Sequence, residues 1–263
     1  MSRLPPLDDA AFDFLYELYH KNLPPLVADS ALEPASTADQ STAADQSTDT
    51  AYKTYRRAET VPLGDTADSP LLNSLQQRAS YTGSTERRPI TDTELATLLE
   101  YSYGEIRATE RGEPRRPVAS GGARYPLELY PIVVDSPDIE AGVYHYNVRD
   151  GTLELLQQGD YSDWIRDTWT WIGDADPVSA VVVITARPAR SAERYGEMGY
   201  LFAAVETGAV IQNLQLVATD LGIGSRPHNG LDYRALRQQL RLRSDEYLMS
   251  TVAFAGTAPS DGD

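Results

Sequence analysis

The sequence has no cysteine, only two lysines (Lys21 and Lys53) and three histidines that lie far apart (His20, His145 and His228). The absence of cysteine excludes disulfides, thiolate nucleophiles, iron–sulfur clusters and cysteine zinc sites. The histidines show no metal-ligand spacing, so the sequence carries no signal for a metal centre. Any redox chemistry in this chain therefore needs an organic cofactor.

A basic stripe and a long hydrophobic run are also missing. Acidic residues outnumber basic ones by 39 to 23, the net charge is -16 and the arginines are scattered among acids, so we expect no nucleic-acid partner. The longest apolar run, 178–186, has the length of a strand, and the N-terminus carries no signal region. We therefore expect a cytoplasmic protein that does not associate with membranes. The acidic, lysine-poor composition resembles that of proteins from salt-loving archaea, since such a surface stays soluble in concentrated salt.

The chain divides into three predicted parts. Residues 1–50 combine a helix over 8–20 with a disordered polar insertion, which buries too little apolar surface to offset the entropy of ordering. Residues 51–257 form one domain, and residues 258–263 form a flexible tail.

Periodicity within this domain predicts alternating helices and strands. Helical spacing and capping signals predict helices near 71–80, 91–103, 161–172, 192–220 and 232–241. Short apolar runs predict strands near 127–134, 143–146, 153–156, 178–186 and 248–255. This order predicts an α+β fold with a mixed, mostly antiparallel sheet flanked by helices.

Two segments carry the strongest functional signal. Ser120-Gly121-Gly122 stands directly before an apolar run, an arrangement that lets the backbone approach a flat ligand closely. The second segment, 208–230, is a predicted helix that a pair of glycines ends and that Pro227-His228-Asn229-Gly230 follows. In this order the segments resemble the nitroreductase-like flavoprotein superfamily and, within it, the SagB-type dehydrogenases that oxidise azolines in modified peptides. The resemblance covers residues 51–256.

The resemblance implies an FMN site. Arg78 and Ser80 would bind the phosphate and the ribityl chain, because an arginine fork donates two charged hydrogen bonds to a phosphate. The residues that would line the flavin edge or offer backbone amides to its ring are Ser120, Gly121, Gly122, Pro227, Asn229 and Gly230. Thr82 stands where the family has a second basic residue. Taken alone, a solvated arginine at a helix end and two plain turns are the simpler interpretation.

Azoline dehydrogenases have a Lys-Tyr pair that acts as acid–base machinery; by this resemblance Tyr195 matches the tyrosine, and Arg194 stands in place of the lysine. An arginine stays charged where a lysine can act as a base, so proton removal would fall to Tyr195 as tyrosinate or to the substrate. The alternative is that both side chains form a solvated helix face beside Glu193 and Glu197. Glu206, further along this helix, is interpreted as a packing acid paired with an arginine.

The first functional hypothesis is therefore an FMN-dependent oxidoreductase of the SagB type. The resemblance implies a homodimer, because such folds build the flavin pocket from two subunits, and it implies a cyclodehydratase and a precursor peptide as partners. The second hypothesis is an NAD(P)H-dependent reductase of nitro compounds or quinones. The third is a flavin-free scaffold that holds a peptide-modifying complex together.

Overall fold

A computed structural model describes residues 57, 59–81, 87–169 and 178–257. The predictions for residues 1–50, for Thr82 and for residues 258–263 lie outside the described residues. The described helices are α2 (Pro70–Gln77), α3 (Asp92–Tyr103), α4 (Ser162–Thr168), α5 (Ala189–Tyr195), α6 (Met198–Asp220) and α7 (Tyr233–Gln239), with the 3-10 turn η4 (Gly121–Ala123). The described strands are β1 (Arg107–Ala108), β2 (Pro114–Arg115), β3 (Leu127–Val133), β4 (Gly142–Asn147), β5 (Thr152–Gln158), β6 (Val178–Ala186), β7 (Ile223–His228) and β8 (Tyr247–Thr257).

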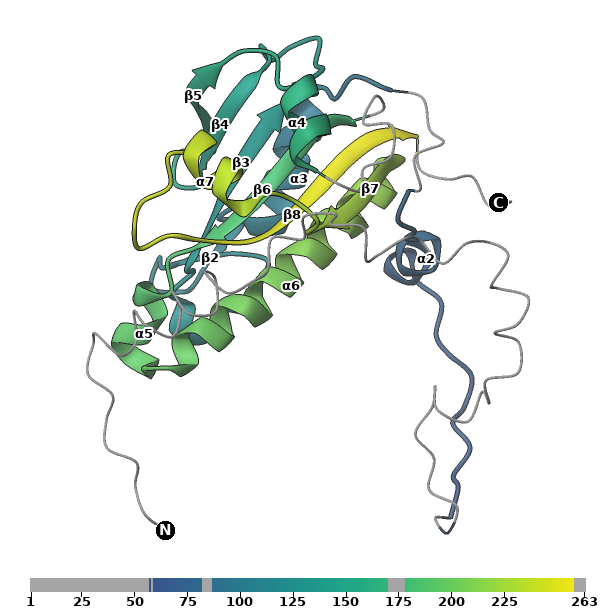
Figure 1. Ribbon diagram of the computed structural model, residues 1–263. Helices are drawn as coiled ribbons and strands as arrows, with labels where there is room; N and C mark the ends of the chain where they lie inside the picture. The colour runs from purple at the N-terminus through teal and green to yellow at the C-terminus, as the bar shows by residue number, and fades with distance from the viewer. Residues whose placement is uncertain (1–56, 58, 82–86, 170–177, 258–263) are drawn as a thin grey trace.

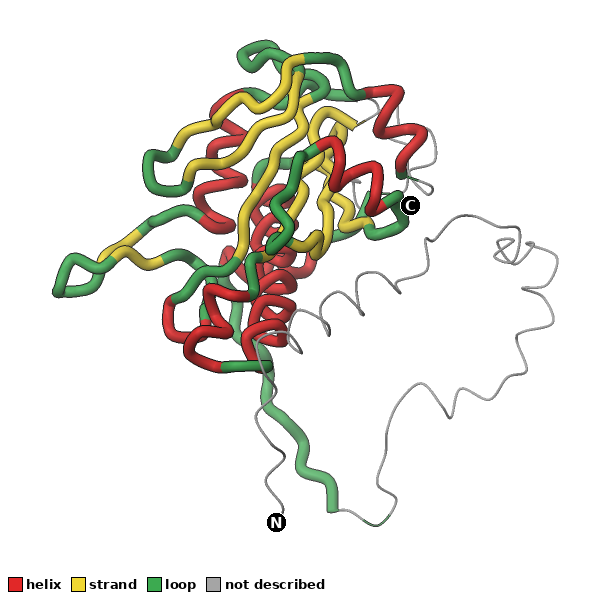
Figure 2. Tube along the Cα trace, turned by 60° about the vertical axis from the view of Figure 1, so that its left-hand side comes forward, coloured by secondary structure: helices red, strands yellow, loops and turns green. Residues whose placement is uncertain are grey.

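A six-stranded sheet in the order β5-β4-β3-β6-β8-β7 forms the centre of the fold (Figure 1). Every pair of neighbouring strands in this sheet is antiparallel. The predicted α+β class and mostly antiparallel sheet are confirmed. The sequence did not predict the two-residue strands β1 and β2, which pair in a separate hairpin (Figure 2), because two residues are too few to show alternation.

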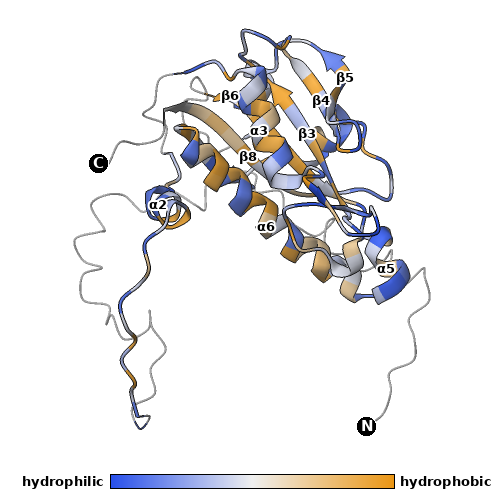
Figure 3. Cartoon of the chain, turned by 180° about the vertical axis from the view of Figure 1, so that it is seen from behind, coloured by the Kyte–Doolittle hydropathy of each residue, from blue (hydrophilic) through white to orange (hydrophobic). Residues whose placement is uncertain are grey.

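The sheet separates two hydrophobic cores. Leu127, Leu129 and Val133 of β3 join one core with residues of α3 and α6. Tyr130 and Ile132, on the opposite face of the same strand, join a second core with residues of α4 and α7. All nine residues of β6 are buried, which explains why this strand appears in the sequence as a continuous apolar run. Hydrophobic residues accordingly concentrate in the central strands and along α6 (Figure 3).

A capping box begins α3 where the sequence predicts one. The Thr91 hydroxyl accepts a hydrogen bond from the Glu94 N–H at 3.2 Å, and the Glu94 carboxylate accepts one from the Thr91 N–H at 3.0 Å. These bonds satisfy backbone donors that the first helical turn leaves without partners.

The prediction of a single helix over 192–220 is wrong, because the structure has two helices there, α5 and α6. Gly196 has a φ of +58°, a conformation that favours glycine and ends α5. After this break α6 turns back across α5, and a Cβ on Gly199 would lie 2.6 Å from the Ala192 nitrogen. Arg194 and Tyr195 therefore lie in the last turn of α5 and not within the long helix.

The sequence also predicts no strand between residues 220 and 232, and this is wrong. Residues Ile223–His228 form β7, which pairs with β8 along its length. Gly224 and Pro227 interrupt the alternating pattern by which a strand is predicted, and both residues are unfavourable in central strands. They are accommodated because β7 lies at the edge of the sheet.

Helix α6 is long and apolar enough, by length and composition alone, to cross a membrane. Its contacts with α3, β7 and β8 place it against the sheet, and its buried residues include Val210, Leu214 and Ala218. Its apolar character is that of a core helix packed on a sheet.

Candidate functional site

The Ser120–Gly122 loop packs directly against Arg194 and Tyr195. Gly122 has a φ of +61°, and a Cβ built on it would lie 2.6 Å from the Tyr195 hydroxyl and 3.4 Å from Arg194 Nη1. The neighbouring Gly121 is equally close to another ring, since its Cβ would lie 2.8 Å from Phe202 Cδ2. The glycines therefore let the loop lie close to the protein's own aromatic side chains, and they bring the two predicted catalytic residues to the predicted flavin-edge loop.

Aromatic packing fixes the position of Tyr195. Its ring meets Phe202 edge to face, with centroids 5.1 Å apart, and the guanidinium carbon of Arg194 lies 5.5 Å from the centroid of the Tyr195 ring. Tyr195 is half-buried while Arg194 is exposed. Arg194 is thus exposed to solvent at the end of α5, whereas the Tyr195 ring is partly covered by Phe202 and the glycine loop.

The loop continues through a strained stretch of backbone. Ala123 and Tyr125 have φ values of 54° and 47°, which side chains other than glycine rarely adopt. The Tyr125 N–H donates a hydrogen bond to the Ser120 hydroxyl at 2.9 Å, which ties the two ends of the strained segment together. Such conformations persist where the surrounding structure enforces them, and they concentrate at functional sites.

A buried carboxyl group lies behind the loop. Glu206 is 1% exposed, and its Oε1 accepts a hydrogen bond of 2.9 Å from the Tyr103 hydroxyl, which in turn accepts one from the Leu127 N–H. Burial raises the pKa of Glu206, and hydrogen bonds from Ser120 and Tyr103 oppose the rise. Glu206 Oε2 has no hydrogen-bond partner among the described residues. This group can hold or release a proton next to the loop.

Arg116 supplies positive charge to this cluster without forming an ion pair with Glu206. Its guanidinium carbon lies 4.3 Å from the Tyr103 ring centroid and 4.6 Å from that of Tyr125, and its charge lowers the pKa of Glu206. Its Nε and Nη1 atoms are buried without partners in the described part of the chain. The predicted arginine partner of Glu206 thus acts through space, and the hydrogen bond comes from Tyr103.

A second group of predicted residues lies along the edge strand β7. Ser80 forms a parallel bridge with Ser225, and the Tyr81 N–H donates to the Ser225 carbonyl at 3.3 Å. This pairing places Arg78 and Ser80 beside a strand position only two residues before Pro227. The structure therefore brings the predicted phosphate-binding residues close to the segment predicted to meet the flavin ring.

Hydrogen bonds to neighbouring residues fix the end of β7. His228 Nε2 lies 3.0 Å from the Gly230 carbonyl oxygen and donates to it, and burial lowers the pKa of His228, which favours the neutral ring. The Thr251 hydroxyl donates to the His228 carbonyl, and Trp169 Nε1 donates to the Thr251 hydroxyl at 3.2 Å. These bonds fix the segment and leave Asn229 exposed at the sheet edge.

The two groups lie toward opposite ends of α6. The Ser74 hydroxyl on α2 donates to Asp220 at the C-terminal end of α6, whereas Gly121 contacts Phe202 near its N-terminal end. A helix of this length spans about 34 Å. Figure 1 shows α2 and α5 at these opposite ends. A single chain therefore does not gather all ten predicted residues into one pocket.

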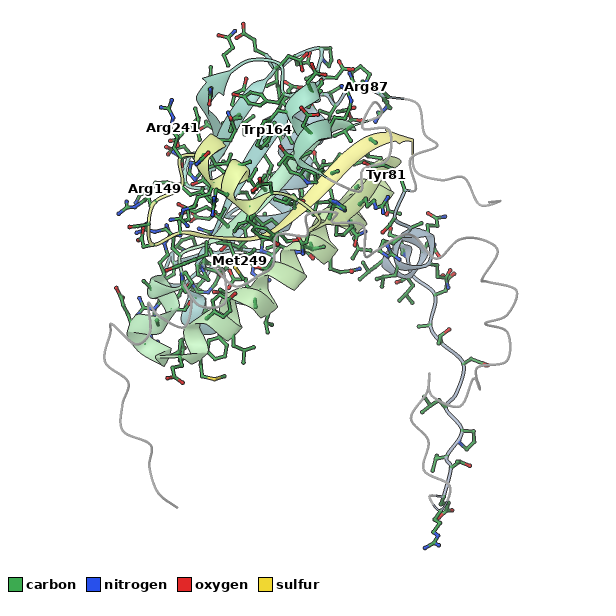
Figure 4. The ribbon with its side chains drawn as sticks, in the orientation of Figure 1. Tyr81, Arg87, Arg149, Trp164, Arg241 and Met249 are labelled. Atoms are coloured by element: carbon green, nitrogen blue, oxygen red, sulfur yellow. The ribbon has the colours of Figure 1, made fainter. Side chains whose placement is uncertain are left out.

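The β7 edge fits a flavin mononucleotide in the kinds of group it offers. Arg78 and the exposed Ser80 present a guanidinium and a hydroxyl for a phosphate and a ribityl chain. The buried hydroxyls of Tyr81 and Ser225 beside them have no hydrogen-bond partner in the described residues, so a ligand here can satisfy them. Burial raises the pKa of Tyr81 to about 12, so its hydroxyl remains a donor; this side chain lies where the chain passes from α2 to the sheet (Figure 4).

Sequence reasoning missed Tyr103, Arg116, Tyr125 and Phe202. Their roles depend on contacts between segments far apart in the chain. In the sequence alone, the aromatic residues cannot be distinguished from ordinary core residues. The only available signal was the Arg115-Arg116 pair four residues before the loop, and this pair matches no motif.

An antiparallel sheet crossed by one long helix, with hydroxyl, guanidinium and glycine groups at its edge, defines an α+β protein of the nitroreductase fold. Residues 78–256 match the Nitroreductase family, and the chain belongs to this family of oxidoreductases, which usually bind FMN.

Two curated relatives and one solved structure show the range of the family that this chain resembles. MJ1384 of Methanocaldococcus jannaschii, whose name assigns it to the nitroreductases, is 32% identical over 167 residues, which are 62% of this chain and 81% of that protein. The microcin B17-processing protein McbC of Escherichia coli is 27% identical over 174 residues, and the aligned part spans 64% of this chain and 63% of McbC. The E. coli microcin synthetase McbBCD complex with truncated pro-MccB17 bound contains a chain of the same fold, with a TM-score of 0.69 at 18% identity, over 96% of this chain and 95% of that one.

Proposed function

We propose that this protein is an FMN-dependent oxidoreductase of the SagB type, which oxidises azolines to azoles in modified peptides. The observation that carries the proposal is the packing of Gly122 against Tyr195 and Arg194, because it places the predicted acid–base pair at the predicted flavin-edge loop. The similarity to McbC, which is named as a microcin B17-processing protein, supports a peptide substrate.

The residues of the β7 edge bind and orient the cofactor in this proposal. Arg78 holds the phosphate, Ser80 contacts the ribityl chain, and the backbone at Asn229 and Gly230 faces the ring. FMN, when bound, supplies a two-electron acceptor.

Tyr195 takes the proton that an azoline ring loses on oxidation. Its hydroxyl is held by the edge-to-face contact with Phe202 and by the close approach of Gly122. A guanidinium group donates hydrogen bonds and does not act as a base, so Arg194 stabilises negative charge beside Tyr195. The buried Glu206, which hydrogen-bonds to Ser120 of the same loop, receives that proton afterwards in this proposal.

A second copy of this chain would complete the site. Met198, Leu201 and Val205 are 46%, 50% and 66% exposed and follow one another at spacings of three and four along α6, which gives an unpartnered apolar stripe on one helix face. Leu71 and Leu75 on α2 are likewise exposed. We infer a homodimer in which the Ser120 loop of one protomer faces the β7 edge of its partner.

The same proposal includes a cyclodehydratase that makes the azoline and a precursor peptide that carries it. Support comes from the McbC similarity and from the fold shared with a chain of the McbBCD complex, which was solved with truncated pro-MccB17 bound. We also propose that the protein is adapted to concentrated salt, which its net charge of -16 supports.

An NAD(P)H-dependent reduction of nitro compounds or quinones is the second candidate. Arg194 in place of a lysine favours it, because an arginine cannot serve as the base of an azoline dehydrogenase. MJ1384, named as a nitroreductase, also aligns over most of its own length.

The deciding experiment is incubation of the FMN-loaded protein with an azoline-containing peptide in air, followed by mass spectrometry. The proposal predicts loss of two hydrogen atoms per ring, absent in Tyr195→Phe. Rapid bleaching of the flavin by NAD(P)H without peptide oxidation would establish the reductase instead. A colourless protein that rejects added FMN yet binds a cyclodehydratase would establish the scaffold.

A further inference from the structure

Tyr125 ends the glycine loop in a conformation that the local sequence does not favour. Its φ of 47° lies in the left-handed region, which residues with a Cβ rarely adopt. Pro126 follows it, and a proline favours extended backbone in the residue before it. The conformation of Tyr125 is therefore imposed by its contacts, and strain of this kind points to a function of the residue.

The Tyr125 side chain is held by Arg116 and Tyr103. The guanidinium carbon of Arg116 lies 4.6 Å from the centroid of the Tyr125 ring, and the Tyr103 ring meets it edge to face with centroids 6.3 Å apart. The Tyr125 hydroxyl accepts a hydrogen bond from the Arg116 N–H at 3.2 Å. Arg116 thus contacts both the face and the hydroxyl of Tyr125, and these contacts require an aromatic ring at this position.

The Tyr125 carbonyl is bound from α5, the helix that ends with Tyr195. Arg190 Nη1 on this helix donates to the carbonyl at 3.2 Å, and Arg190 Nη2 donates to Glu128 on β3. One guanidinium group therefore joins the end of the glycine loop, the sheet and the helix that carries Tyr195.

The Tyr125 N–H fixes the hydroxyl of Ser120 at the other end of the strained stretch. The N–H donates to Ser120 Oγ at 2.9 Å. The Ser120 hydroxyl also hydrogen-bonds to Glu206, and this bond opposes the rise that burial causes in the pKa of Glu206. Because an ionised carboxylate only accepts hydrogen bonds, Ser120 is the donor in that bond while Tyr125 holds its oxygen from the other side.

We propose that Tyr125 is a positioning residue, which keeps the Ser120 hydroxyl on Glu206 and sets the glycine loop against the helix of Tyr195. The inference rests on the proposed function, in which Tyr195 takes a proton from the azoline and Glu206 receives it afterwards. Tyr125 acts through Ser120 and Arg190 and not by contact with the substrate. Loss of its ring lets the strained backbone relax, and the Ser120 hydroxyl then leaves Glu206.

Infrared difference spectroscopy of the purified full chain during a pH titration tests this position. The protonated carboxyl group of Glu206 gives a carbonyl band that Glu206→Gln lacks. In Tyr125→Gly, the midpoint of this band should shift to higher pH, because the ionised carboxylate loses the hydrogen bond from Ser120. The kcat for oxidation of an azoline peptide should fall about a hundredfold in the same variant.

Three further variants separate positioning from stability. Arg190→Gln removes the contact with the Tyr125 carbonyl and should shift the midpoint in the same direction. Tyr125→Phe keeps the ring and the backbone N–H, so its midpoint and kcat should stay close to those of the wild type. Arg241→Gly is the matched control for strain, since Arg241 follows α7 with a φ of 50°, and it should move neither value.

The proposal is overturned if the midpoint is unchanged in Tyr125→Gly or, should that variant not fold, in Arg190→Gln. It is also overturned if Tyr125→Phe or Arg241→Gly shifts the midpoint as far as Tyr125→Gly, or if a folded Tyr125→Gly keeps the kcat of an active wild type. A shift of the midpoint as expected, in a protein whose wild type oxidises no azoline, would support the placement of Ser120 and refute the proposed function alone.

Discussion

Gly122→Ala tests the contact between the glycine loop and Tyr195. Alanine at this position must adopt a φ of +61°, which costs about 1–2 kcal/mol for a residue with a Cβ. The new methyl group must also displace the Tyr195 hydroxyl, since the two atoms would lie 2.6 Å apart. Because Tyr195 packs edge to face on Phe202, moving it costs roughly a further 0.5–1.5 kcal/mol.

Gly151→Ala is the matched control. Gly151 has nearly the same φ, +62°, but a Cβ there meets nothing within 4 Å. Its substitution should therefore cost only the backbone term of about 1–2 kcal/mol. Urea denaturation monitored by circular dichroism gives the free energy of unfolding of both variants. The difference between their losses of stability measures the Tyr195 contact.

A double-mutant cycle with Tyr195→Phe completes the test. Phenylalanine lacks the hydroxyl that the new methyl group meets, so Gly122→Ala should cost less in the Tyr195→Phe background than in the wild type. Azoline oxidation should also fall about a hundredfold in Gly122→Ala, because a small displacement of a reacting group has large kinetic effects. Equal costs for Gly122→Ala and Gly151→Ala, with no coupling to Tyr195, would refute the packing of the loop on Tyr195.

Three further predictions concern the phosphate site, a helix cap and an ionised histidine. Arg78→Gln should weaken FMN binding by roughly 10- to 100-fold by fluorescence titration, since it removes charged hydrogen bonds to phosphate. Thr91→Ala should lower the free energy of unfolding by about 1 kcal/mol in urea, because it removes the cap of α3. Glu128 and Glu154 raise the pKa of His145, so its contribution is full below the unfolded value of about 6.5 and is lost as pH rises through the higher folded value. The stability difference between wild type and His145→Gln should therefore shrink above neutral pH, and a difference that grows with pH would contradict the ion pairing.

Local signals in the sequence predicted much of this fold. The capping box at Thr91 and the apolar run of β6 depend on residues adjacent in the chain, so α3 and β6 were predicted correctly. The break between α5 and α6 at Gly196 was not predicted, because a glycine inside an apolar helical pattern does not by itself end a helix. Strand β7 was missed because Gly224 and Pro227 interrupt its pattern, and only its place at the sheet edge makes them tolerable.

The candidate site shows a sharper limit of sequence reasoning. The order of motifs along the chain identified the residues, but it could not show that Arg78 and Ser120 belong to groups toward opposite ends of α6. Arg116 was invisible for a related reason, since it acquires its role only when the rings of Tyr103 and Tyr125 close around it. Distances of this kind are set by helix length and packing, which motifs do not encode.

The composite FMN site is the central claim, and subunit complementation tests it most directly. Arg78→Gln damages the β7 edge and Gly122→Val damages the loop, so each homodimer should lose FMN. A refolded equal mixture of the two variants contains heterodimers with one intact site each, so it should recover roughly a quarter of the wild-type FMN, measured by visible absorbance of the dimer fraction. No recovery in a mixture shown to form heterodimers, or FMN bound by a monomer, would contradict a site shared between two chains.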